Sequence, residues 1–190
     1  MKSKLVMLTL AVTCAFAGNA MALTKEEYKA QKDRVEADYK ASREKCGTLS
    51  ANAKDICQAE AKGAEKIAKA ELEAQYKPSP RQDQKVLDAK ADAAYDLAKE
   101  KCDDMSGNAK DVCMKDAKAA RTSAKADAKV TKTSADANKD KAGAMADAKK
   151  DAASVKNDAQ YKAAKERCDA MAGNAKDSCQ NDAKAKFGMK

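Results

Sequence analysis

Apolar side chains are sparse along this chain, and around three pairs of cysteines they recur with the spacing of one helix face. In each copy a tyrosine, a small residue, the first cysteine and a larger apolar residue stand at i, i+3, i+7 and i+10. This spacing predicts a helix whose stripe packs against a partner helix. The stripes are Tyr39, Ser42, Cys46 and Leu49; Tyr95, Ala98, Cys102 and Met105; and Tyr161, Ala164, Cys168 and Met171.

Each cysteine pair encloses ten residues that carry the signals of a helix end and a helix start. In the second copy the pattern predicts Gly107 just after one helix, Asn108 as the N-cap of the next, and Asp111 in its first turn. The predicted turn then lies about equally far from Cys102 and Cys113. The two sulfurs should therefore face each other across an αα-hairpin.

The third copy repeats this turn as Gly173-Asn174, whereas the first copy has Ala51-Asn52. Alanine is strained in the left-handed conformation that glycine adopts freely, so the first turn should be the least comfortable of the three. Two other helix starts are marked by caps. Thr24 begins a capping box, and Ser79 precedes Pro80 at the first helical position.

The N-terminal residues have the pattern of a secretory signal peptide. Lys2 and Lys4 form a basic start, a short apolar run follows, and Ala20-Met21-Ala22 is a small-x-small cleavage site. Cleavage after Ala22 would leave a periplasmic or secreted chain with no transmembrane segment. The alternative is a lipoprotein signal acylated at Cys14, but Thr13 is bulkier than the residue that usually precedes such a cysteine. In either case Cys14 is not available for a disulfide, and six cysteines remain.

Six cysteines in an exported chain favour disulfides over free thiols. Because each pair flanks its own turn, the predicted pairing is Cys46 with Cys57, Cys102 with Cys113, and Cys168 with Cys179. The expected organisation is a signal peptide over residues 1–22, a helical hairpin over 23–77, a linker over 78–80, a second hairpin over 81–133, and a helical segment with a third hairpin over 134–190. The tract 130–134, at the boundary between the second hairpin and the last segment, is expected to weaken the helix because it is rich in β-branched residues.

The predicted fold class is all-α, with three elongated hairpins that are each clipped by a disulfide across the turn. Beyond residue 22, Leu, Ile, Val, Met and Phe make up about a tenth of the chain and alanine about a quarter, which is a composition at the edge of independent folding. Alanine favours helix but buries little area. The disulfides are therefore expected to take the place of a large core.

No catalytic, cofactor-binding or metal-binding constellation stands out. The chain has no histidine, and the cysteine spacing is neither the short knuckle of a zinc site nor the C-x-x-C of a redox catalyst. The adjacent carboxylates Asp103 and Asp104 do not converge on a helix, so acid/base chemistry and calcium binding are not expected. Without a phosphate loop or a serine in a nucleophile context, an enzyme is not expected.

Charge gives the remaining indication of function. The formal net charge of +8 falls to +6 once Lys2 and Lys4 leave with the signal peptide, and it is spread over interleaved lysines and aspartates. This pattern is typical of a solvated helix surface. The alternative is a diffuse attraction to an anionic polymer or lipid of the envelope, effective at low salt. Nucleic acid is not an expected partner, because the acidic content nearly matches the basic content.

The segments YDLAKEKCDDMSGNAKDVCMKDAKAA and YKAAKERCDAMAGNAKDSCQNDAKAK resemble small exported, Ala/Lys-rich helical envelope proteins of Gram-negative bacteria. The resemblance extends by composition to the central helix of TolA, but that helix lacks cysteine cassettes. It implies a periplasmic place and brings no activity. The expected function is a non-enzymatic structural, interaction or stress-protection role at the cell envelope. The alternative is a binding module for an anionic envelope polymer or lipid.

Overall fold

The structure is a computed structural model that describes residues 23–136 and 142–189. These ranges contain α1 (Lys25–Cys46), α2 (Ala51–Tyr76), α3 (Pro80–Cys102), α4 (Gly107–Ala135), α5 (Ala142–Cys168) and α6 (Gly173–Phe187), and no strand. The predicted fold class of helical hairpins clipped by disulfides is confirmed. The expected signal peptide, with Cys14 and the cleavage site after Ala22, lies outside the described residues.

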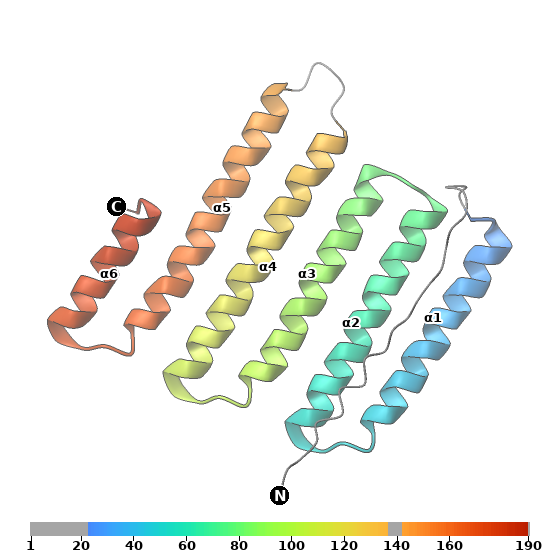
Figure 1. The fold of residues 1–190 in the computed structure, drawn as a ribbon, viewed down its shortest axis with the longest axis horizontal. Coiled ribbons are helices and arrows are strands. Elements are labelled where there is room, and N and C mark those ends of the chain that lie inside the picture. The colour runs from blue at the N-terminus through green and yellow to red at the C-terminus, as the bar shows by residue number, and fades with distance from the viewer. Residues whose placement is uncertain (1–22, 137–141, 190) are drawn as a thin grey trace, which may run out of the picture.

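The six helices form one layer, side by side in chain order, with alternating directions (Figure 1). Among the described residues each helix contacts only the helices that precede and follow it in the chain. The contacts between hairpins, α2 with α3 and α4 with α5, are the most extensive. The three hairpins therefore pack as one continuous row, in which no other described residues cover one long side of α1 and one of α6.

The predicted caps at two helix starts are present. The Thr24 hydroxyl accepts a hydrogen bond from the Glu27 amide, and the Glu27 carboxylate accepts one from the Thr24 amide, which completes the capping box. Ser79 caps α3 through the Gln82 amide, with Pro80 at the first helical position. Both caps satisfy amides that have no partner within their helix.

The tract 130–134 is helical, and α4 ends directly after it at Ala135. The hydroxyls of Thr131, Thr133 and Ser134 each donate to the carbonyl four residues earlier. These local hydrogen bonds are a normal way for a helix to accommodate such residues. The predicted hairpin boundary at residues 133 and 134 thus falls inside α4.

The position of the turns differs from the sequence prediction. Helix α3 ends at Cys102, and α4 begins at Gly107 after the N-cap residue Ser106, so the turn precedes the glycine. The Met105 amide donates to the Cys102 carbonyl at 3.0 Å, and this bond forms the turn directly after α3. Gly107 keeps its left-handed conformation, with φ of 56°, but as the first residue of the new helix.

The strain predicted for the first turn is present at Ala51. Its φ is 50°, close to the 56° and 57° of Gly107 and Gly173 at the same position of the other repeats. A left-handed conformation costs an alanine about 1–2 kcal/mol, because its Cβ approaches the following carbonyl. The first hairpin therefore carries a backbone cost that the other two avoid.

Ala51→Gly is expected to raise the free energy of unfolding by about 1 kcal/mol, because it relieves this strain. Ala53→Gly is the matched control. It introduces the same residue two positions later, inside α2, and should lower the free energy of unfolding by about 1 kcal/mol. Urea unfolding of both oxidised variants tests the difference. If Ala51→Gly did not stabilise the protein, the assigned strain would be contradicted.

The buried core is thin, as the composition predicts. The side chains buried among the described residues are almost all alanine, together with Leu72 and the first cysteine of each pair. Cys46, Cys102 and Cys168 are 0%, 0% and 1% exposed and are the largest fully buried side chains. The disulfides therefore occupy the best-packed positions of the row.

Candidate functional site

Three disulfides join neighbouring helices along one edge of the row, where the turns within the hairpins lie. They pair Cys46 with Cys57, Cys102 with Cys113, and Cys168 with Cys179, with Cα–Cα distances of 5.6, 5.7 and 5.7 Å. The cysteines are not symmetric about their turns, however. Cys102 is the last residue of α3, whereas Cys113 lies six residues beyond the start of α4, about 9 Å along its axis. The second helix of each hairpin therefore begins beyond the end of the first helix. Its cysteine lies beside the cysteine that ends the first helix.

The apolar residue of each turn is exposed, contrary to the expected stripe. Leu49, Met105 and Met171 are 42%, 46% and 47% exposed, because the preceding helix ends at the cysteine and releases them from its face. Their amides hold the same hydrogen bond to the cysteine carbonyl, at 3.1, 3.0 and 3.0 Å. The three turns lie along the same edge of the row (Figure 1). We call these three residues the turn edge.

The tyrosines of the stripes are half-buried, as expected for side chains that pack between helices. The Tyr95 ring lies under the Arg121 guanidinium, 5.0 Å from the ring centroid. Tyr28 stacks on Tyr76 at 4.4 Å and donates to the Glu73 carboxylate, which raises the pKa of the Tyr28 hydroxyl. These contacts join helices within a hairpin.

Asn52 and Asn108 each join one hairpin to the next, although the sequence predicts Asn108 as an N-cap. The Asn52 side chain donates to the Glu100 carbonyl at 2.7 Å, and the Asn108 side chain donates to the Glu166 carbonyl at 3.1 Å. Each asparagine lies at the start of a hairpin's second helix, and each carbonyl near the end of the following helix. The helix starts of α2 and α4 have no side-chain cap. Sequence reasoning missed this role, although the asparagine occurs in all three copies.

Ion pairs also join the helices of the row. Lys66 pairs with Asp96 at 2.8 Å between α2 and α3, and Lys115 pairs with Glu166 at 3.2 Å between α4 and α5. Asp92 of α3 accepts from Lys125 and Arg121 of α4. Burial alone would raise the pKa of Asp92, but the hydrogen bonds and charges of the two cations outweigh it and lower that pKa. Several lysines and acidic residues thus pair between helices.

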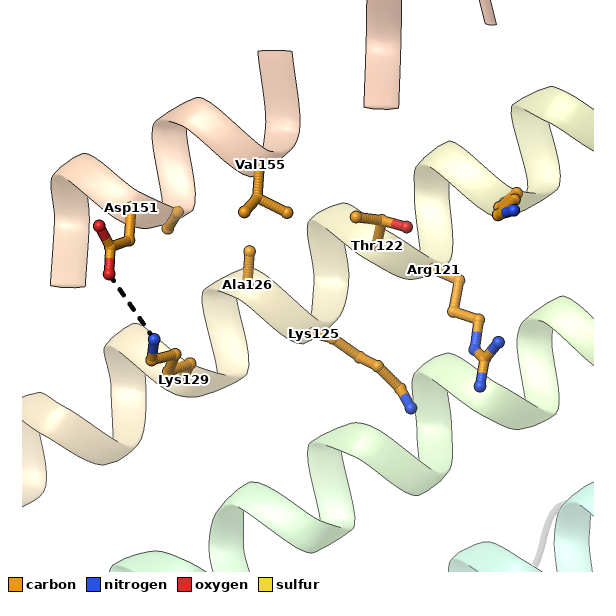
Figure 2. Close-up of a pocket in the computed structure, with 9 residues that line it drawn as sticks. Arg121, Thr122, Lys125, Ala126, Lys129, Asp151 and Val155 are labelled. Atoms are coloured by element: carbon orange, nitrogen blue, oxygen red, sulfur yellow. Dashed lines mark ion pairs between the residues drawn. The ribbon is translucent and has the colours of Figure 1, made fainter. Parts of the chain in front are cut away.

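A groove of about 440 Å³ lies between α4 and α5 (Figure 2). Val155 and Ala126 face each other across it, and Lys118, Arg121, Lys125 and Lys129 line it. Arg121 and Lys125 reach toward α3, where Asp92 holds them, and Lys129 pairs with Asp151 at 3.8 Å. Lys118 has no ion pair in the described part of the chain. The groove is therefore basic, but three of its four cations already have partners.

The carboxylates at the turns serve as ion-pair partners. Asp103 pairs with Lys110 at 2.8 Å, and Asp169 pairs with Lys176 at the same distance. The hydrogen bond from each lysine lowers the pKa of the aspartate. Over residues 23–136 and 142–189, no group of three or more His, Cys, Asp or Glu side chains could hold a metal ion. None of the helices in these ranges is long and apolar enough to cross a membrane.

Comparison with protein-family models, curated proteins and solved structures finds no match to this chain. The function must therefore be inferred from the geometry of the turns, the helix contacts and the groove.

Proposed function

We propose that this chain is a non-enzymatic structural and interaction protein of the cell envelope that contacts its partner through the turn edge. The observation that carries the proposal is the repeated exposure of Leu49, Met105 and Met171 along the edge of the row where the three hairpin turns lie. Single exposed apolar residues are common on proteins. An apolar residue exposed at the same position and held by the same hydrogen bond in three successive turns is a repeated surface feature, and this repetition supports the turn edge as the interaction site.

A structural role accords with how the chain uses its charges. Several lysines and acidic residues pair with one another across the helix contacts. The longest described helix, α4 with 29 residues, extends about 43 Å, so the row forms a broad, thin layer of helices. The disulfides and the signal-peptide pattern favour the periplasm as the site of this role. Protection of client proteins under stress would use the same surface.

The turn edge can be tested by exchanging its three apolar residues for serine. The variant Leu49→Ser, Met105→Ser, Met171→Ser should fold as the wild type does, because none of the three side chains belongs to the buried core. In intact envelopes the oxidised wild type should capture an envelope protein by crosslinking. We expect the serine variant to capture at least tenfold less of that protein. The control variant Leu87→Ser, Val155→Ser removes two exposed apolar residues that are not at the turns.

The proposal predicts that this control captures the partner as the wild type does. Equal capture by the wild type and the turn-edge variant would contradict a role for the turn edge.

The second candidate function is binding of an anionic envelope polymer or lipid, which the groove between α4 and α5 favours. Its cations surround an apolar floor that includes Ala126, Ala152 and Val155, and this combination suits an anionic amphiphile. Salt-sensitive co-sedimentation with vesicles of anionic phospholipid that Lys118→Glu abolishes would favour this candidate. The pairing of three groove cations with carboxylates places it second.

A further inference from the structure

The contacts between successive hairpins repeat along the row, and the two ends of the row carry the two halves of one more such contact. A hairpin's second helix meets the following hairpin's first helix twice, at α2 with α3 and at α4 with α5. Helix α6 occupies the place of α2 and α4 in the repeat, and α1 occupies the place of α3 and α5. They also have the matching directions, since helices alternate along the row (Figure 1).

The asparagine bond is the first shared feature. Asn52 and Asn108 donate to the carbonyls of Glu100 and Glu166, each two residues before a helix-ending cysteine. Asn174 is the equivalent residue of α6, and it is exposed, whereas Asn52 and Asn108 are half-buried. Glu44 is the equivalent residue of α1, two residues before Cys46. Both halves of a third asparagine bond are therefore present at the ends of the row.

Small residues at equivalent positions of the contact are the second shared feature. At the first contact Gly63 lies so near Ala93 that a Cβ built on the glycine would stand 3.0 Å from the Ala93 Cβ. At the second contact the equivalent residues are Ala119 and Ala159, which line one groove together. The equivalent residues at the ends of the row are alanines as well. They are Ala185 on α6 and Ala37 on α1, and both are exposed.

Opposite charges lie at equivalent positions of the three contacts. Arg167 of α5 pairs with Asp116 of α4. The ends of the row have Lys45 on α1 and Asp182 on α6 at these positions, both exposed. The first contact has Lys101 and Glu60 there without an ion pair between them, so this charge pair is not constant, whereas the asparagine bond is present at both internal contacts.

From these three features we infer that α6 of one copy of this chain docks against α1 of a second copy, head to tail, and extends the row. Asn174 donates to the Glu44 carbonyl of the next copy, Ala185 packs on Ala37, and Asp182 pairs with Lys45. The two surfaces are different, so the contact is heterologous and each added copy exposes a new α6. Ser178 replaces the Ile56 and Val112 of the equivalent helices, and α6 is only 15 residues long, so this contact is weaker than the internal ones.

The test blocks each end separately with an arginine, which a helix tolerates well. Ala37→Arg closes the α1 surface and Ala185→Arg closes the α6 surface. Ala153→Arg is the control, since Ala153 is exposed on α5, an inner helix of the row. Sedimentation equilibrium of the oxidised proteins, over concentrations extending into the millimolar range, measures the mass. Circular dichroism checks that each variant is folded.

We expect the mass of the wild type and of Ala153→Arg to rise with concentration, and each blocked variant alone to remain a monomer. An equimolar mixture of the two blocked variants should form dimers and nothing larger, because only one open pair of surfaces remains. Asn174→Ala should weaken the wild-type association about two- to tenfold through loss of one hydrogen bond. A wild type that stays monomeric, blocked variants that still associate, or a mixture that forms no dimer would each overturn the inference.

Discussion

Replacement of all six paired cysteines by serine is expected to remove most of the stability of this protein. Each disulfide closes a loop of about twelve residues and contributes about 3 kcal/mol, whereas a typical domain is stabilised by about 5–15 kcal/mol in total. The row has little else to compensate, because its other buried side chains are mainly alanines. We therefore expect a strongly lowered thermal midpoint and an expanded hydrodynamic radius.

Helical structure should partly survive the loss of the disulfides. Alanine has the highest helix propensity, and the caps at Thr24 and Ser79 do not depend on the cysteines. Far-UV circular dichroism at low temperature should therefore retain a substantial helical signal. The same melting temperature for the six-serine variant and the oxidised protein would show that burial holds the fold without the disulfides.

The second large effect is expected at Leu72, which is 4% exposed and is the one large aliphatic side chain buried among the described residues. Leu72→Ala should lower the free energy of unfolding by about 2–5 kcal/mol, through lost burial and the cavity that remains. A thin core cannot distribute this loss over many neighbours. Urea unfolding of the oxidised variant measures it.

Leu87→Ala is the matched control for Leu72. It deletes the same atoms from α3 at a site that is 37% exposed, and should cost less than about 1 kcal/mol. Equal costs at the two sites would mean that burial of Leu72 does not contribute to the stability of the row.

The hairpins could be predicted from the sequence because each rests on local signals. Alanine-rich stretches favour helix, Thr24 and Ser79 mark helix starts, and the cysteine spacing identifies the helices that are joined. Even the strain at Ala51 follows from comparing one position of the three copies. The exact turn could not be predicted. Gly107 has the left-handed conformation that its sequence suggests, but that conformation suits a helix start here as well as a helix end.

The single-layer row was beyond the reach of sequence reasoning, because alanine faces with interleaved charges do not identify their partner. The contacts that set the row depend on atoms far apart in the sequence, such as Asn108 and the Glu166 carbonyl. The only sequence signal was the repetition of this asparagine in each cassette. An asparagine near a helix start is normally interpreted as a cap, and that interpretation hid its role between hairpins.

Peptide mapping of the protein isolated from the periplasm without reductant tests the central claim most directly. Trypsin cleaves after Lys54, Lys110 and Lys176, each of which lies between the two cysteines of one cassette. Every disulfide within a cassette must therefore appear as two tryptic peptides that separate on reduction. The account predicts three such pairs, no free thiol, and an N-terminus at Leu23. A crosslinked peptide that joins two cassettes, or free thiols in the native material, would contradict it.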